Sequence, residues 1–126
     1  MRLLTPLILI LALIIGLGAW TNDLLEDSAR ELSQQIEVIS GQIAEESWEE
    51  AVKHTNKLEE TWEKEARWWP IFLEHQEIDN IEFALARTKE YVASENSSLA
   101  RGHLSELKLM IEHIPEKEAV NLKNIL

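Results

Sequence analysis

Residues 24–43 read LLEDSARELSQQIEVISGQI, and the spacing of apolar residues in this segment decides the fold class. Apolar side chains recur at alternating steps of three and four residues, which places them on one face of an α-helix. They are Leu25, Ala29, Leu32, Ile36, Ile39 and Ile43. Polar and charged side chains occupy most of the positions between them. The segment therefore predicts an amphipathic helix that buries one face against neighbouring helices.

Three further segments show the same spacing of apolar or small side chains. The corresponding residues are Trp48, Ala51, Thr55, Leu58 and Trp62, then Ile71, Ile78, Ile81, Leu85, Thr88 and Val92, and then Ala100, Leu104, Leu107, Ile111 and Ile114. A short tail helix is expected to carry Ala119, Leu122 and Leu126. No segment has the two-residue alternation that is typical of a half-buried β-strand. We therefore expect an all-α fold.

Residues that begin helices lie between these segments. Asp23 with Glu26, and Ser47 with Glu50, have the three-residue spacing of a capping box, in which each side chain bonds a backbone N–H at the start of a helix. Pro70 disfavours helical geometry in the residue before it and is compatible with the first turn of the next helix. These residues predict helix starts near Asp23, Ser47 and Pro70.

Turn residues complete the predicted organisation. Residues 96–98 are Asn-Ser-Ser, which combine turn and N-cap chemistry, and Pro115 is expected to end the fourth helix. The connections are then short, about two to five residues, so consecutive helices become antiparallel neighbours. The predicted architecture is an antiparallel bundle, or a pair of helical hairpins, of about four helices followed by a short C-terminal helix.

The chain before these helices is apolar. From Leu3 to Trp20 it contains no charged side chain, and all 23 acidic residues come later. These 18 residues, as a helix, rise about 27 Å, against roughly 30 Å for a bilayer hydrocarbon core. Pro6 suits the first turn of such a helix, and Trp20 suits the membrane–water interface. Arg2 favours a cytoplasmic amino terminus, so the chain after Thr21 is expected outside the cell membrane.

A cleaved signal peptide is the alternative interpretation of the same segment. Its apolar core would be residues 7–17, and its small-residue cleavage site would include Gly16 and Gly18. Both interpretations make residues 1–21 a membrane anchor or signal segment. Both place residues 22–126 on the extracytoplasmic side as one acidic helical domain.

The composition limits the possible ligands and chemistry. The formal net charge is −11, and because Arg2 contributes +1 the rest of the chain carries −12, which repels nucleic acids and anionic lipid headgroups. The chain has no cysteine, which excludes disulfides, thiolate nucleophiles and zinc–thiolate sites. It has no nucleophile elbow, glycine-rich phosphate loop or His-Glu-x-x-His motif. We expect neither enzymatic activity nor a bound cofactor.

Several short runs resemble those of a known family. The resemblance rests on Ser47-Trp48-Glu49-Glu50-Ala51, on Leu58, Trp62 and Trp69, on His75-Gln76-Glu77-Ile78, and on Leu122-Lys123-Asn124-Ile125-Leu126. Over nearly its whole length the chain is similar to domain of unknown function family 4363. Members of that family are small, N-terminally anchored helical proteins of Gram-positive, mostly spore-forming bacteria. The resemblance implies no activity, but it implies a multi-pass membrane protein as a partner.

One group of residues is a candidate metal site. His75, Asp79 and Glu82 lie four and then three residues apart, which places an imidazole and two carboxylates on one helix face. With help from another helix they would suit a divalent metal ion. The simpler interpretation is that His75 is partly buried and pairs with Asp79 as part of the packing.

An aromatic corner is the second candidate. Trp62, Trp68, Trp69 and Pro70 lie close together in the sequence, and exposed tryptophans at a bend could stack on cell-wall sugars. The simpler interpretation is that Trp62 and Trp69 fill the core while Trp68 covers the corner.

The sequence thus predicts a non-enzymatic, membrane-anchored, extracytoplasmic helical domain for protein interaction or structural support. The alternative is a small sensor or ligand-binding module, which would use the His75 group for a divalent metal or the aromatic corner for a cell-wall sugar.

Overall fold

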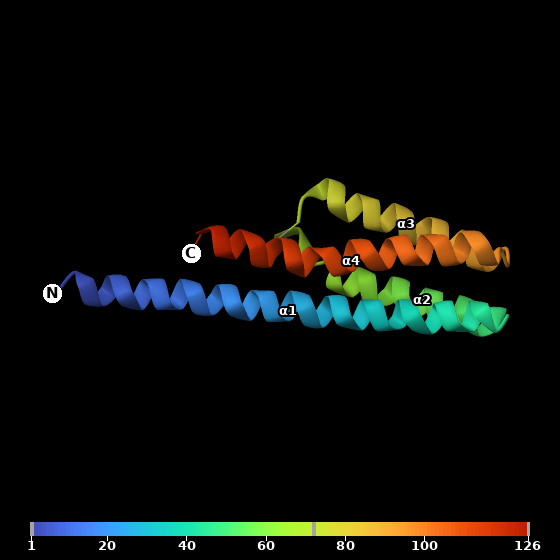
Figure 1. Ribbon diagram of the computed structural model, residues 1–126, viewed down its shortest axis with the longest axis horizontal. Helices are drawn as coiled ribbons and strands as arrows, with labels where there is room; N and C mark the ends of the chain where they lie inside the picture. Colours follow the sequence, from blue (N-terminus) through green and yellow to red (C-terminus); the bar gives the residue numbers. More distant parts are fainter. Residues whose placement is uncertain (1, 72, 126) are drawn as a thin grey trace.

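The computed structural model describes residues 2–71 and 73–125, and its regular structure is helical (Figure 1). The elements are α1 (Leu4–Ala44), α2 (Trp48–Glu65), the 3₁₀-helix η1 (Trp69–Ile71), α3 (His75–Ala93) and α4 (Ser97–Ile125). No β-strand occurs in these two stretches of chain. The predicted all-α fold is therefore confirmed.

The four α-helices form a closed antiparallel bundle. Helix α1 packs against α2 and α4, and α3 packs against the same two helices, so each helix has two neighbours. Successive helices run in opposite directions along the long axis of the molecule (Figure 1). The contact between α1 and α4, the first and last helices, closes the bundle. It decides between the two predicted arrangements in favour of a bundle over separate hairpins.

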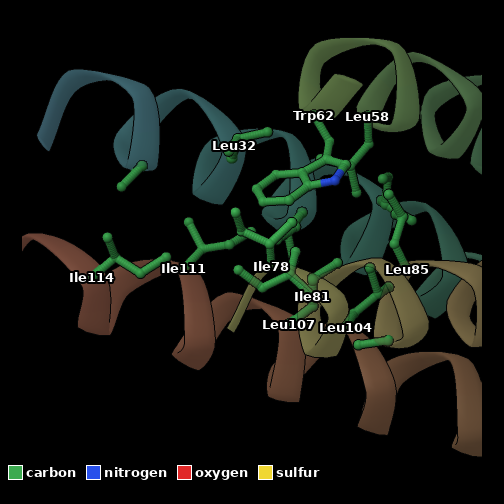
Figure 2. Packing of buried hydrophobic residues seen from close by; sticks show 14 of the residues in the cluster. Leu32, Leu58, Trp62, Ile78, Ile81, Leu85, Leu104, Leu107, Ile111 and Ile114 are labelled. Carbon is green, nitrogen blue, oxygen red and sulfur yellow. The ribbon is translucent and has the colours of Figure 1, made fainter. Parts of the chain in front are cut away.

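The core is built from the predicted faces of the helices. Every residue predicted for the buried faces of α1 and α4 is buried, as are those of α3 from Ile78 onward. On α2 only Trp48 departs from the prediction, because it is partly buried at the edge of the core. Figure 2 shows side chains from all four helices meeting in one layer, among them Leu32, Trp62, Ile81 and Leu107. Removing this apolar area from water, at roughly 25 cal/mol per Å², is the main stabilising contribution.

Helix α1 is one uninterrupted helix of 41 residues, about 60 Å long. Pro6 lies in its first turn, as predicted. The capping box predicted at Asp23 and Glu26 is wrong, because both residues lie in the helix interior. No proline or glycine separates Trp20 from Leu25, so nothing in the local sequence interrupts the backbone hydrogen bonds. The apolar segment and the first helix of the bundle are therefore a single element.

Two other helix ends differ from the prediction. Pro70 lies in η1, and α3 begins only at His75, after Glu74 adopts an extended backbone with φ −71° and ψ 151°. Leu73 in this connection is buried, so the chain packs onto the core before the helix begins. The separate tail helix is also wrong, because α4 continues through Pro115. Proline removes one backbone donor but has a helical φ, so a long helix can include it at a cost in stability.

The α1–α2 and α3–α4 connections lie together at one end of the bundle, which we call the distal end (Figure 1). Glu46 and Glu95 adopt left-handed backbone conformations there, with φ of 59° and 57°. In each connection, the left-handed residue and the one after it donate backbone N–H bonds to carbonyls three and five residues earlier, at 2.8–3.1 Å. This pattern is the Schellman motif, and it satisfies carbonyls at the ends of α1 and α3.

The two helices that leave the distal end begin differently. Helix α2 begins after Ser47, as predicted, but the Ser47 side chain makes no capping hydrogen bond, so the capping box with Glu50 is wrong. The backbone of Ser47 (φ −84°, ψ 66°) lies outside the extended region that an N-cap usually adopts. At the start of α4, the Asn96 side chain does act as a cap, because its Oδ1 accepts the Leu99 N–H at 3.2 Å.

Candidate functional site

The first half of α1 is a continuous exposed apolar surface. Every residue from Leu3 to Trp20 is exposed except Gly18, which is half-buried. Trp20 exposes 61% of its surface, whereas Leu25, five residues later, exposes 0%. By length and composition, α1 could cross a membrane, and no other helix in the described chain passes that test. A signal sequence would have the same properties. Such a surface favours a non-aqueous environment, which the bundle does not need.

The aromatic corner is part of the core. Trp62 and Trp69 expose only 3% and 0% of their surfaces, and their rings meet edge to face with centroids 5.1 Å apart. Trp68 is half-buried against Trp69 and donates its indole N–H to Glu65 Oε2 at 2.9 Å. Pro70 is exposed. Two of the three rings are inaccessible to a sugar, so the packing interpretation describes this corner.

Burial of these two indoles has an opposing cost. Neither Trp62 Nε1 nor Trp69 Nε1 has a hydrogen-bond partner within the described chain. An unpaired buried donor costs about 1–3 kcal/mol. An indole removes about 150–250 Å² from water, and at roughly 25 cal/mol per Å² that gain exceeds the cost. The net effect still favours burial of both rings.

The structure does not assemble His75, Asp79 and Glu82 into a metal-binding group. All three side chains are exposed on α3, so the interpretation of His75 as partly buried is wrong. Across residues 2–71 and 73–125, no group of three His, Asp or Glu side chains is placed to hold a metal ion. The physical reason is that α2 and α4 pack against the apolar face of α3, which leaves the face with these three residues toward solvent.

Comparison with known proteins places the chain in a family. The family model described as Domain of unknown function (DUF4363) matches residues 19–125. The chain belongs to the DUF4363 family. The resemblance noted in the sequence is confirmed, and the matched range contains the whole buried core, from Leu25 to Ile114. No curated protein and no solved structure gives a significant match.

In this DUF4363 protein, polar side chains join the first and last helices of the bundle. We define the α1–α4 seam as Ser33 and Glu37 of α1 with Lys108 and Glu112 of α4. Ser33 Oγ donates to Glu112 Oε1 at 2.8 Å. Lys108 donates to the Glu37 carboxylate and lies 3.9 Å from Glu112 Oε1. Ser33 is buried at the edge of the core, whereas the two carboxylates, Glu37 and Glu112, are exposed to solvent.

The seam stabilises the charged form of Lys108. The hydrogen bond to Glu37 raises the pKa of Lys108 above its usual 10.5, and the negative charges of Glu37 and Glu112 add to this effect, while partial desolvation opposes it. The Lys108 ammonium thus lies between two exposed carboxylates, where solvent screens the attraction.

A shallow groove lies beside the seam. It has a volume of about 330 Å³ and is lined by Glu26, Ala29, Arg30, Ser33, Gln34, Glu37 and Glu112. Arg30 lies 3.5 Å from Asp27, a loose contact between two exposed side chains. The groove is open to solvent, so water would screen its charges and compete for its hydrogen-bonding groups. It offers no enclosed site for chemistry.

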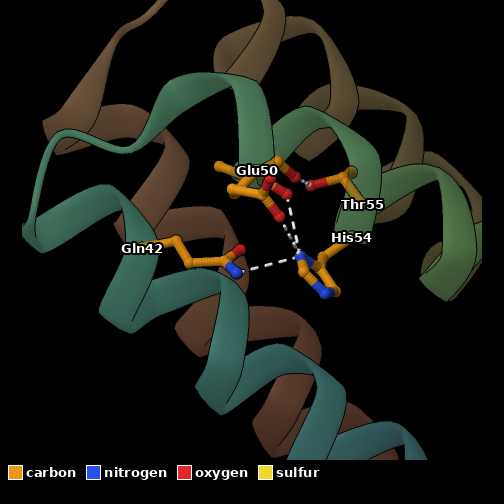
Figure 3. Close-up of polar contacts among 5 residues, drawn as sticks. Gln42, Glu50, His54 and Thr55 are labelled. Atoms are coloured by element: carbon orange, nitrogen blue, oxygen red, sulfur yellow. Dashed lines mark hydrogen bonds and ion pairs between the residues drawn. The ribbon is translucent and has the colours of Figure 1, made fainter.

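A second polar group links α1 to α2. His54 Nδ1 lies 2.9 Å from Gln42 Nε2 and also 2.9 Å from the carbonyl oxygen of Glu50 (Figure 3). A neutral imidazole nitrogen either donates or accepts, so Nδ1 cannot serve both neighbours in this amide orientation. The other amide atom, Gln42 Oε1, is buried and has no partner in the described chain. Rotating the amide by 180° would let one Nδ1–H serve both oxygens.

The seam was not among the predicted features, although the sequence contains a signal for it. Ser33, Glu37, Lys108 and Glu112 each directly follow an apolar residue of the buried faces. Positions beside the apolar face flank the contact between neighbouring helices, where opposite charges can pair. The sequence could have suggested such flanking pairs, but not that α1 and α4 are the helices that meet.

Proposed function

We propose that this protein is a non-enzymatic, membrane-anchored helical domain that binds or supports another protein on the extracytoplasmic side of the cell membrane. The observation that carries this proposal is that the two halves of α1 have different environments. Residues 3–20 of the helix are apolar and exposed, and from Leu25 onward the same helix is part of a filled bundle core. A helix that needs lipid at one end and protein at the other fits an anchored domain.

The link between anchor and bundle is stiff. Four residues, 21–24, separate Trp20 from the first buried side chain, Leu25, and all of them are helical. A helical connection cannot swing as a flexible linker does. The bundle would therefore stand directly on the membrane with its long axis continuing that of the anchor. A fixed orientation of this kind suits structural support or presentation of one surface to a partner.

The proposed partner is a multi-pass membrane protein. A lone apolar helix can pack against other membrane helices, and a glycine such as Gly16 would allow close approach of a neighbouring helix. Outside the membrane, the net charge of −12 that follows Arg2 would attract basic loops of a partner. Both contacts are available to one protein only if that protein lies in the same membrane.

Two observations support an interaction role over the alternative of a ligand-binding module. Trp62 and Trp69 are buried, which leaves no two-ring platform for a sugar. His75, Asp79 and Glu82 are exposed along one helix face, and α2 and α4, the helices that pack on α3 in the described chain, lie against its other face. An enzyme would in addition need an enclosed pocket with tuned titratable groups, and the groove beside the seam is open.

The topology can be tested with single-cysteine variants, because the chain has no native cysteine. Leu3→Cys, which keeps Arg2, and Glu46→Cys would be reacted with a membrane-impermeant maleimide in right-side-out and inside-out vesicles. We expect Glu46→Cys to react only in right-side-out vesicles and Leu3→Cys only in inside-out vesicles. The opposite pattern would refute the extracytoplasmic placement. A mature chain that begins near Ala19 would retain export but remove the anchor.

The partner can be tested by purifying the full chain from detergent-solubilised membranes and identifying bound proteins by mass spectrometry. The matched control replaces residues 3–20 with a leucine-rich anchor of equal length, which keeps the bundle on the membrane. We expect a multi-pass protein in stoichiometric amount with the natural chain and a clear reduction with the control. Equal recovery of only abundant chaperones from both samples would contradict the proposed partner.

A further inference from the structure

The seam defines how α1 and α4 align. Ser33 pairs with Glu112, and one turn further along α1 the residue Glu37 pairs with Lys108, one turn earlier in α4. The two helices are thus antiparallel, and each step toward the anchor on α1 corresponds to an equal step toward the end of α4. This register can be followed beyond the seam because both helices continue without a break.

If this register is extended toward the N-terminus of α1, the end of α4 lies beside Trp20. Trp20 is thirteen residues before Ser33, and Ile125 is thirteen residues after Glu112, so Ile125 lies level with Trp20. Figure 1 shows the same arrangement, since α4 extends past the end of α2 and the start of α3 alongside the first half of α1. Trp20 is the residue that ends the apolar segment.

Helix α2 does not reach this level. Gln35 pairs with Thr61, and Gln42 lies opposite His54, which sets the register of α2 against α1. The last residue of α2, Glu65, is therefore level with residue 31 of α1, eleven residues short of Trp20. At about 1.5 Å per residue, α2 ends roughly 16 Å from the level of Trp20. Among the helices that pack on α1, α4 alone continues to the end of the anchor.

We propose that the end of α4, residues 121–125, lies in the headgroup layer of the leaflet from which the bundle emerges. This inference rests on the proposed function, because it requires residues 3–20 to span the membrane. The headgroup layer extends about 5–7 Å beyond the hydrocarbon core on each side, so a helix end level with Trp20 lies inside it. The membrane then contacts the protein at two neighbouring helices, α1 and α4.

The composition of this segment agrees with an interfacial location. Residues 121–125 read NLKNI and contain no acidic side chain, although the whole chain contains 23. Phosphate groups would repel carboxylates, whereas apolar side chains with asparagine and one lysine suit the boundary between headgroups and water. A second contact also has a mechanical consequence. It restricts rotation and tilt of α1, so the bundle holds a fixed orientation relative to the membrane.

Site-directed spin labelling of the full chain in phosphatidylcholine nanodiscs tests this inference. Ile125→Cys reports on the proposed contact, Leu11→Cys on the anchor and Glu95→Cys on the distal end. Collision rates with oxygen, which concentrates in lipid, and with a nickel chelate, which stays in water, give the depth of each label. We expect the Ile125 label to have a several-fold higher oxygen-to-nickel ratio than the Glu95 label and a lower ratio than the Leu11 label.

Each other result refutes the inference in a distinct way. If the Ile125 label has the same oxygen-to-nickel ratio as the Glu95 label while the Leu11 label lies in hydrocarbon, the lipid contact is refuted and the anchor is not. A Leu11 label with a ratio as low as that of the Glu95 label would refute both the membrane anchor and the lipid contact. An Ile125 label shielded from both reagents would show that protein covers the helix end in place of lipid. Thermal melts of the labelled variants, matched to the natural chain, confirm that each is folded.

Discussion

Glu46 and Glu95 occupy equivalent backbone positions at the distal end of the bundle, each as the left-handed residue that ends a helix, with φ of 59° and 57°. Glycine is the usual residue at such a position, because it has no Cβ to clash with the neighbouring carbonyl. For any other L-residue the left-handed conformation costs about 1–2 kcal/mol. The two turns that connect the helix pairs are therefore both strained in the same way.

Replacing either residue with glycine should stabilise the protein. We expect Glu46→Gly and Glu95→Gly each to raise the free energy of unfolding by about 1 kcal/mol, because relief of the left-handed strain outweighs the greater freedom of glycine in the unfolded chain. Urea denaturation followed by circular dichroism measures the change. Glu46→Ala is the control, since it removes the charge but keeps the Cβ. An equal gain in that variant would attribute the effect to charge.

Truncation of the buried indole at position 69 should nearly unfold the bundle. Trp69 is fully buried and packs edge to face against Trp62. We expect Trp69→Ala to lower the free energy of unfolding by about 3–5 kcal/mol through lost burial and the cavity that remains. The half-buried Trp68 is the matched control, and Trp68→Ala should cost clearly less. A cooperative melt of Trp69→Ala close to that of the natural chain would disprove this packing.

Removal of the first twenty residues should leave the stability of the bundle unchanged. From Leu3 to Trp20 no described side chain is buried, and the core begins at Leu25. We expect a chain that starts at Thr21 to unfold within about 0.5 kcal/mol of the full chain in a suitable detergent. A chain that starts at Arg30 loses Leu25 and Ala29 from the core and should be markedly less stable. Unfolding of both fragments would show that the anchor is needed for folding.

Alkaline pH should weaken the α1–α4 seam. The pKa of Lys108 is raised above 10.5 in the folded protein, so the lysine binds its proton more tightly there than in the unfolded chain. Its contribution to stability is therefore complete below pH 10.5 and is lost as the pH rises through the higher, folded value. Urea midpoints between about pH 9 and pH 12 measure this loss. In Lys108→Met the same pH range should produce a smaller decline, and parallel curves would contradict the assignment.

Much of the fold could be predicted from the sequence, because helical periodicity is a local property. The steps of three and four that begin at Leu25 and Ala100 identify the buried faces of α1 and α4 residue by residue. The break near Pro70 and the cap at Asn96 also follow from local chemistry. The same local reasoning was wrong for the capping box at Asp23, where a good capping residue lies inside a longer helix.

The sequence by itself determined the all-α class, the apolar segment and the choice of face that each helix buries. Only the tertiary structure showed that α1 packs against α4, that Lys108 forms an ion pair with Glu37, and that the His75 side chain is exposed to solvent. The physical reason is distance along the chain. Hydrophobic spacing is set within a few turns of one helix. The side-chain pairs of the α1–α4 seam, and the residues of α1 and α4 that lie side by side, depend instead on how segments 70 or more residues apart align once they pack.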